Sequence, residues 1–367
     1  MHNKKIFLSF LLIFAIFNPL FAVSNTQIDT VRGKESIADA DAAIIEEYVA
    51  DVFAELMIKT DFSDASVLRN SIVSKSTSTN PTGKILYDAK YLAAFQNELK
   101  DASSKANAMK DGQTKTLLIT NLLILSYDIS NPDSYKTAAD YLQNSSTLIR
   151  YWAAKNFENG NVIRKLNEGN EADRKNAASK ILKAVQSEQS PEVLAIYAQF
   201  ASGIKYPGGN EILTAIAQKR IDQYVAWTVK EEITDDVILK ALADRTKTEP
   251  ESTKTMAKYF ASLLSVAIQR YTTGQQVIGD TSKGYLASVI TQSDKYMPTF
   301  VPEWSGNFKR AIDKDTASLV TESDSAFGSA SGSGKMPASV GFDYGKNADG
   351  TAKTVPPALS KSQANAN

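Results

Sequence analysis

Apolar residues recur at three- and four-residue spacing along most of the chain, which is the spacing of one face of an α-helix. The clearest stretches run from residue 37 to residue 57 and from residue 256 to residue 271, with polar residues between the apolar positions. No segment alternates apolar and polar residues convincingly over the length of a strand. The pattern therefore predicts an all-α fold.

The same spacing predicts several further helices, but it leaves one short apolar run open to two interpretations. Residues 116–125 are apolar almost all round, so we expect neighbours to cover them on several sides. A buried strand is the rival interpretation of so short a run, but the leucine-rich composition and the helical neighbours favour a helix. The other expected helices span about 67–73, 84–105, 211–229, 238–242, 286–297 and 308–319.

A helix-pair pattern recurs between Asn131 and Ser202. The segment 145–149 (Ser-Ser-Thr-Leu-Ile) is matched 45 positions later by the segment 190–194 (Ser-Pro-Glu-Val-Leu). Serine or proline stands where each helix is expected to begin, because the first backbone N–H groups lack partners within the helix. A period of this length suits a repeat of two helices.

The repeated helices are too short to fold alone, since each carries only three or four apolar turns. Stacking side by side would bury the faces that each helix leaves open. The shift of 45 positions places Tyr197 over Trp152, and Phe157 lies one turn further along the first copy. We expect Trp152, Phe157 and Tyr197 to fill the cores of their units.

The segment Ile149-Arg150-Tyr151-Trp152-Ala153-Ala154-Lys155 resembles the second helix of a HEAT repeat, where a valine-arginine pair precedes a run of alanines. The resemblance covers about residues 131–202. It departs from the family at Trp152, where a small residue is usual, and at Ala195, which replaces the arginine in the second copy. It implies a right-handed stack of antiparallel helix pairs, an α-solenoid, in a family of binding scaffolds that generally have no chemistry of their own.

In such a stack the second helices line the concave side, which the resemblance implies is the surface for another protein. We expect Arg150, Lys155 and Gln199 to contact that partner. Arg150 has a second interpretation, because a buried guanidinium needs fixed acceptors and in HEAT-like repeats this arginine more often bonds within the stack.

The first residues predict a secretory signal peptide. Lys4 and Lys5 precede an apolar run over residues 6–17, and Ala22 or Ser24 offers a small residue for cleavage. The run is shorter than the roughly 20 apolar residues that a spanning helix needs. We therefore expect residues 1–22 to be removed and the protein to reach the periplasm or cell envelope, without membrane association after removal.

Composition excludes several classes of site. The one histidine, His2, lies in the predicted signal peptide, and the chain has no cysteine. This excludes Ser-His-Asp and Cys-His nucleophiles, zinc sites built on His or Cys, and haem held by either. Removal of the signal leaves 39 basic and 41 acidic residues, a net charge of −2. Without a basic patch the chain has no footprint for nucleic acid, and we expect no cofactor.

Carboxylates are then the remaining groups for hydrolysis, as in two-carboxylate glycoside cleavage. They cluster at Glu46-Glu47 and at Glu231-Glu232 with Asp235-Asp236. Adjacent residues on one helix point in different directions. Asp235-Asp236 suits the start of a helix, where the backbone dipole favours negative charge. We therefore expect no catalytic residue in these clusters.

The composition changes at residue 321, and residues 321–367 contain few large apolar side chains. Such a segment cannot offset a chain entropy of about 1–2 kcal/mol per residue, which predicts a disordered tail after a helical domain over residues 23–320. Within it, residues 328–335 have the composition of a phosphate-binding loop. Five residues rather than four separate Gly328 from Gly334, and Met336 follows the lysine, so a flexible linker is favoured.

These observations favour an exported, non-enzymatic helical-repeat scaffold that binds another protein in the periplasm or cell envelope. Two alternatives stay open. One is a carboxylate-dependent, polysaccharide-cleaving enzyme on an all-α frame, which requires an acidic residue with a strongly raised pKa in a deep cleft. The other is an envelope structural protein that self-associates.

Overall fold

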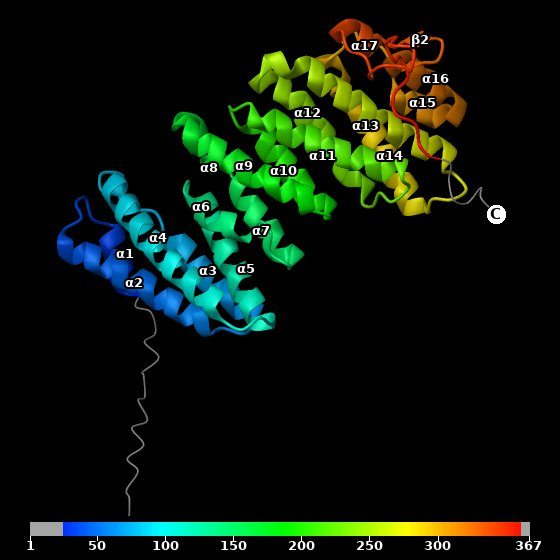
Figure 1. Cartoon of the computed structure of the whole chain (residues 1–367). Helices are drawn as coiled ribbons and strands as arrows, with labels where there is room; N and C mark the ends of the chain where they lie inside the picture. Colours follow the sequence, from blue (N-terminus) through cyan, green and yellow to red (C-terminus); the bar gives the residue numbers. More distant parts are fainter. Residues whose placement is uncertain (1–24, 361–367) are drawn as a thin grey trace, which may run out of the picture. The chain divides into compact units, whose positions relative to one another are not determined.

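The computed structural model describes residues 25–360, which fold mostly as α-helices (Figure 1). Within these residues there are 17 α-helices, four short 3-10 helices and one two-stranded hairpin. The predicted all-α class is confirmed. The predicted signal peptide, residues 1–22, lies outside the described residues. None of the helices between residues 25 and 360 combines the length and the apolar character that crossing a membrane requires.

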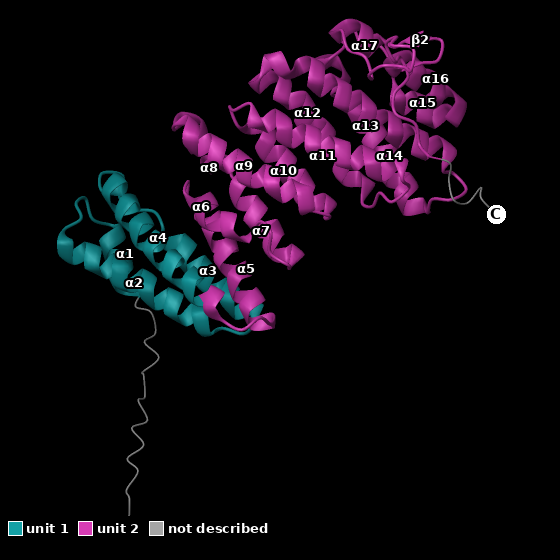
Figure 2. Ribbon diagram, in the orientation of Figure 1, with its two compact units in different colours: residues 1–105 teal, residues 106–367 magenta. Residues whose placement is uncertain are grey.

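The chain divides into two compact units, with the boundary between Lys105 and Ala106 (Figure 2). Unit 1 contains α1 (Asn25–Arg32), α2 (Asp39–Ile58), α3 (Phe62–Lys75) and most of α4 (Lys84–Ala108). The two units are described separately below.

The core of unit 1 forms where the predicted amphipathic face of α2 meets α3 and α4. Ile45, Val49 and Phe53 of α2 are buried, and the ring centroid of Phe53 lies 5.6 Å from that of Phe95 on α4. The hydroxyl of Tyr91 on α4 donates to the carbonyl of Ile72 on α3 at 2.8 Å. These contacts explain why apolar spacing alone located the three helices.

Unit 2 contains the remaining helices and the hairpin. In chain order they are α5 (Gln113–Asp128), α6 (Ser134–Ala138), α7 (Thr147–Glu158), α8 (Gly160–Glu168), α9 (Glu171–Ser187), α10 (Pro191–Gly203), α11 (Gly208–Val225), α12 (Asp235–Thr248), α13 (Thr253–Thr273), α14 (Asp280–Ser293), α15 (Phe308–Lys314), α16 (Thr316–Phe327), β1 (Gly328–Ser329), β2 (Gly332–Ser333) and α17 (Lys335–Val340), with 3-10 helices at Ala139–Tyr141, Glu232–Thr234, Pro250–Ser252 and Met297–Thr299.

The apolar run at residues 116–125 lies within α5, so the helical interpretation is confirmed and the rival strand is wrong. Every residue from Leu118 to Ser126 is buried. A helix covered this completely needs no polar face, which is why its apolar residues show no helical periodicity.

The helices of unit 2 pack in two rows (Figure 1). In the first row α5, α7, α10 and α12 each contact the next, and in the second row α9, α11 and α13 do the same. The rows also contact each other, since α10 packs on α11 and α12 packs on α13. Helices in these rows are thus covered by neighbours in more than one direction.

The regular spacing of helix starts continues beyond the two helices that the sequence pattern matched. Thr147, Pro191 and Asp235 begin α7, α10 and α12, so consecutive starts lie 44 residues apart. The sequence pattern matches only the first two of these helices, α7 and α10, and it does so at a shift of 45 residues. α12 lacks the aromatic residues that made the match visible, but it occupies the next place in the row.

The aromatic residues of the repeat have two different environments. Phe157 and Tyr197 are fully buried, as expected, and the ring centroid of Phe157 lies 5.7 Å from that of Phe200 on the next helix of the row. Trp152 is only half-buried, so the prediction that its side chain fills the core is wrong. Its ring packs edge-on against Tyr127 and Tyr151 instead.

The prediction of a disordered tail from residue 321 is wrong for residues 321–360. α16 and α17 pack on α13, and Phe327 and Met336 are fully buried. The entropy argument assumed that the tail would have to build its own core. Here a few large side chains insert against helices that are already folded, so less apolar surface is required. Residues 361–367 lie outside the described residues.

Candidate functional site

Arg150, the first of the predicted partner contacts, is bound within unit 2. Its Nε and Nη2 atoms donate to the two carboxylate oxygens of Glu188 at 2.7 and 2.9 Å, and Nη1 donates to the carbonyl of Asn144 at 2.9 Å. Only 16% of its side chain is exposed. This is the internal role that the sequence analysis weighed against partner binding, and it ties α7 to the connection between α9 and α10.

The surroundings of Glu188 stabilise its ionised carboxylate. Its side chain is 1% exposed, and one carboxylate oxygen also accepts from the backbone N–H groups of Gln189 and Ser190, at 2.9 and 2.8 Å. Burial raises the pKa of Glu188, but the Arg150 guanidinium and the two N–H donors outweigh it, so the net pKa is lowered. The ionised pair is therefore part of the folded frame.

The lowered pKa of Glu188 sets a pH dependence of stability. Its contribution is fully present above the ordinary value of 4.5 and is lost as the pH falls through the lower folded-state pKa. Glu188→Gln is expected to cost about 1.5–3 kcal/mol at pH 7. In urea unfolding, the difference from wild type should shrink steadily below pH 4.5.

Glu192→Gln is the matched control for that experiment, because Glu192 lies only four residues further along, in the first turn of α10, and is exposed. It should change the free energy of unfolding by less than about 0.5 kcal/mol. A Glu188→Gln penalty that is the same at pH 3 and pH 7 would contradict the role of the ionised pair.

Lys155 and Gln199, the other predicted partner contacts, occupy equivalent positions of neighbouring helices. They lie 44 residues apart, which is also the separation between the starts of α7 and α10. Lys155 pairs with Glu158 at 2.7 Å, and its Nζ lies 5.2 Å from the ring centroid of Tyr127. Gln199 is exposed.

Three half-exposed aromatic rings form a chain of contacts, with Lys155 over one of them, and sequence reasoning missed them as a group. The ring centroid of Trp152 lies 6.0 Å from that of Tyr127 on α5 and 5.6 Å from that of Tyr151. We call Tyr127, Tyr151, Trp152 and Lys155 the aromatic patch. The signal in the sequence was the departure from the HEAT pattern at Trp152, because a large ring replaces a small residue there.

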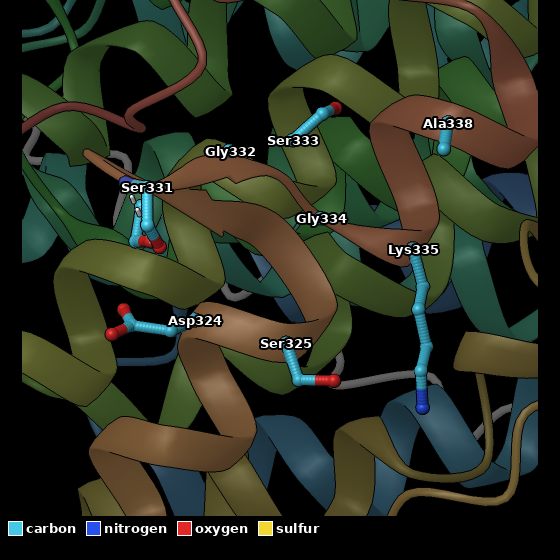
Figure 3. Close-up of a pocket in the computed structure, with 9 residues that line it drawn as sticks. Asp324, Ser325, Ser331, Gly332, Ser333, Gly334, Lys335 and Ala338 are labelled. Atoms are coloured by element: carbon cyan, nitrogen blue, oxygen red, sulfur yellow. Dashed lines mark hydrogen bonds between the residues drawn. The ribbon is translucent and has the colours of Figure 1, made fainter.

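A second candidate site is an open hollow of about 520 Å³ beside the β1–β2 hairpin (Figure 3). The hydroxyls of Ser329 and Ser331 hydrogen-bond to each other at 2.7 Å. Lys335 points away from the hairpin serines, and its Nζ lies 5.7 Å from the ring centroid of Trp304. The hollow is lined by Asp324, Ser325, Ser329, Ser331, Gly332, Ser333, Gly334, Lys335 and Ala338.

This hollow offers hydroxyls, one ammonium and the carboxylate of Asp324, and among the described residues no hydrogen bond joins that carboxylate to a serine hydroxyl of the lining. The flexible-linker interpretation of residues 328–335 is wrong, since they form the hairpin and begin α17. Gly328 has φ +104°, and a Cβ there would lie 2.5 Å from the carbonyl oxygen of Thr354, so only glycine fits. The serines and glycines thus serve a tight turn.

The acidic clusters are not arranged as acid and base. Glu46 and Glu47 are exposed on α2, whereas Asp235 is buried at the start of α12, where it was predicted. Asp235 pairs with Arg220 at 2.7 Å. Across residues 25–360, no group of three or more acidic or histidine side chains is placed to hold a metal ion.

Together these features define an all-α protein whose second unit contains two rows of packed helices, with an aromatic patch on the first row. No family of known proteins, no curated protein and no solved structure matches the chain. The resemblance to HEAT repeats therefore depends on the residues of α7 and α10 alone.

Proposed function

We propose that this protein is an exported, non-enzymatic scaffold that binds another protein through the first helix row of unit 2. In this proposal the two rows are a HEAT-like α-solenoid, a right-handed stack of antiparallel helix pairs. Residues 1–22 direct export to the periplasm or cell envelope and are then removed.

The aromatic patch is the observation that carries the proposal. Tyrosine and tryptophan are enriched at the centres of protein interfaces, because one rigid side chain provides a large contact area at low entropic cost. Tyr127, Tyr151 and Trp152 are held by edge-to-face contacts yet remain half-exposed. Gln199 is exposed on α10, the next helix of the same row, and in this proposal it belongs to the polar rim of the interface.

The use of the buried charges also supports a scaffold. Glu188 pairs with Arg150, Asp235 with Arg220, and Glu232 with Arg270 at 3.3 Å. A carboxylate enzyme would need such groups to face a substrate, whereas these acids hold helices together. Burial therefore favours stability rather than acid–base chemistry at these positions.

Site-specific photo-crosslinking tests the proposal in intact cells. A photoreactive amino acid at Gln199 should give one discrete product with another protein, because this side chain lies exposed on the row. The same amino acid at Lys180, which is exposed on α9 of the other row, is the control and should not give that product. Trp152→Ala should remove the product from Gln199 if the helix content of the variant is unchanged.

Two results would contradict the proposal. A product with twice the mass of the chain would favour the self-associating structural protein instead. Equal products from Gln199 and Lys180 would show that the first row has no special role.

A further inference from the structure

The last described residues of the chain lie extended across unit 2. We call residues 355–360 the strap. On α13, the Gln269 side chain donates to the carbonyl of Pro357 at 2.8 Å and accepts from the N–H of Leu359 at 3.1 Å. Just beyond α11, the indole N–H of Trp227 donates to the carbonyl of Ser360 at 2.9 Å.

The strap is recognised mainly through its backbone. Val225, Trp227 and Gln269, which we call the strap site, make five hydrogen bonds with it among the described residues, and four of these use main-chain atoms of the strap. The fifth uses the hydroxyl of Ser360. Main-chain bonding combined with an aromatic side chain is how domains bind extended, proline-containing peptides, which lose little entropy because proline is already extended.

Trp227 stands at a position where its backbone is strained. Its N–H donates to the carbonyl of Tyr224, and the N–H of Thr228 donates to that of Gln223, so α11 ends in a Schellman motif. The residue after the cap must then be left-handed, and Trp227 has φ +60° where glycine is preferred.

Neighbouring residues hold the Trp227 ring in place. The guanidinium of Arg270 lies 5.3 Å from the ring centroid, and the lack of a side chain at Gly274 leaves room beside the ring. A strained residue that is supported in this way indicates that its side chain is used.

The strap is held by little apolar burial. Of its six residues only Pro356 is buried, while Ala358 and Ser360 are exposed. The bonds from the Trp227 indole and from the Ser360 hydroxyl are open to water and contribute little to stability, which favours release of the strap without unfolding of the helices below it.

We propose that the strap site binds an extended, proline-containing segment of another protein, and that residues 355–360 occupy the site until that segment displaces them. The seated strap defines the chemistry that fits: two consecutive prolines, then a main-chain N–H for Gln269 and a carbonyl for Trp227. This inference rests on the proposed scaffold function and assigns it a second binding surface with a stated class of partner.

The experiment uses a fluorescent peptide with the sequence of residues 354–360 and measures its anisotropy with the full mature chain. In wild type the strap competes at the high effective concentration of a tethered segment. The double variant Leu359→Pro and Ser360→Pro removes both strap N–H donors, and should bind the peptide roughly tenfold more tightly than wild type or more.

Two variants sharpen this measurement. Ala358→Pro is the matched control, because it adds a proline to the strap without removing the donors at residues 359 and 360, and it should bind like wild type. Adding Trp227→Gly to the double variant should weaken peptide binding about tenfold, because it removes the indole N–H that donates to the peptide backbone. Helix content should not fall, since glycine favours the left-handed position.

Three outcomes separate this inference from the proposed function. Absence of peptide binding by the double variant would overturn the strap site and leave crosslinking at Gln199 unaffected. Peptide binding that depends on Trp227, without a crosslink at Gln199, would support the strap site and contradict the role of the first row. Dimers of wild type that form with concentration and are lost in the double variant would assign the site to exchange between copies and overturn the partner proposed here.

Discussion

Asp235→Ala is expected to lower the free energy of unfolding by about 3–5 kcal/mol, the usual cost of removing one partner from a buried ion pair. The carboxylate of Asp235 accepts from Nε and Nη2 of Arg220 at 2.7 and 3.0 Å and from the hydroxyl of Tyr224 at 2.7 Å. Both ion-pair side chains are 0% exposed. The substitution leaves a guanidinium without its counter-charge between α11 and α12, and urea unfolding followed by circular dichroism measures the loss.

Asp236→Ala is the matched control, because it removes the adjacent carboxylate from the same first turn of α12. Asp236 is half-buried and accepts a hydrogen bond from Tyr296 at 3.0 Å, so the expected cost is about 1 kcal/mol. Equal losses in the two variants would show that charge at the helix start, and not the buried pair, explains the effect. Combining Asp235→Leu with Arg220→Met should recover part of the stability, since no unpaired charge then remains.

Asp235 shows which part of the fold the sequence could predict and which part it could not. Acidic residues favour the first turn of a helix for local reasons, and α12 does begin at Asp235. Its partner Arg220 lies on another helix. Periodicity identifies a helix and its buried face, but the choice between possible neighbours depends on side-chain shapes in three dimensions. The buried pair was therefore beyond sequence reasoning.

The sequence likewise predicted the buried core of α7 better than it predicted the candidate sites. The apolar spacing of α7 correctly placed Ile149, Ala153 and Phe157 on a buried face, but it also placed Leu148 there, which is 50% exposed. It placed Trp152 with them, because spacing cannot tell whether a neighbouring helix covers the edge of a face. The strap was even harder to predict from the sequence. Its contacts are mostly to main-chain atoms, and every residue except proline has the same backbone donor and acceptor.

Arg245→Met is the second large expected effect, at about 3–5 kcal/mol, because it removes one buried cation that satisfies several carbonyl groups at once. Arg245 is fully buried in α12. It donates to the carbonyls of Ala201, Ile204 and Tyr206 at the end of α10 and just beyond it, and to the side chain of Asn210. Burial lowers the pKa of Arg245, because taking the guanidinium out of water disfavours its charged form.

Arg174→Met is the matched control for this role. Arg174 also donates to backbone carbonyls at the end of a helix, at 2.7 Å to Gly169 and 3.2 Å to Leu166, but its side chain is half-buried and water can replace those bonds. The expected cost is about 1 kcal/mol. Losses of the same size for Arg174 and Arg245 would contradict the importance of burial.

Gly209 provides an independent check on the geometry around Arg245. A Cβ at residue 209 would lie 2.9 Å from Cζ of Arg245 and 2.5 Å from the carbonyl oxygen of Ala201, so Gly209→Ala should be destabilising. In the Arg245→Met background the more flexible side chain can move aside, and the added cost of Gly209→Ala should fall by about 0.5 kcal/mol or more. Strict additivity of the two changes would mean that only the nearby carbonyl oxygen of Ala201 requires glycine at residue 209. The guanidinium of Arg245 would then not depend on the absence of a side chain there.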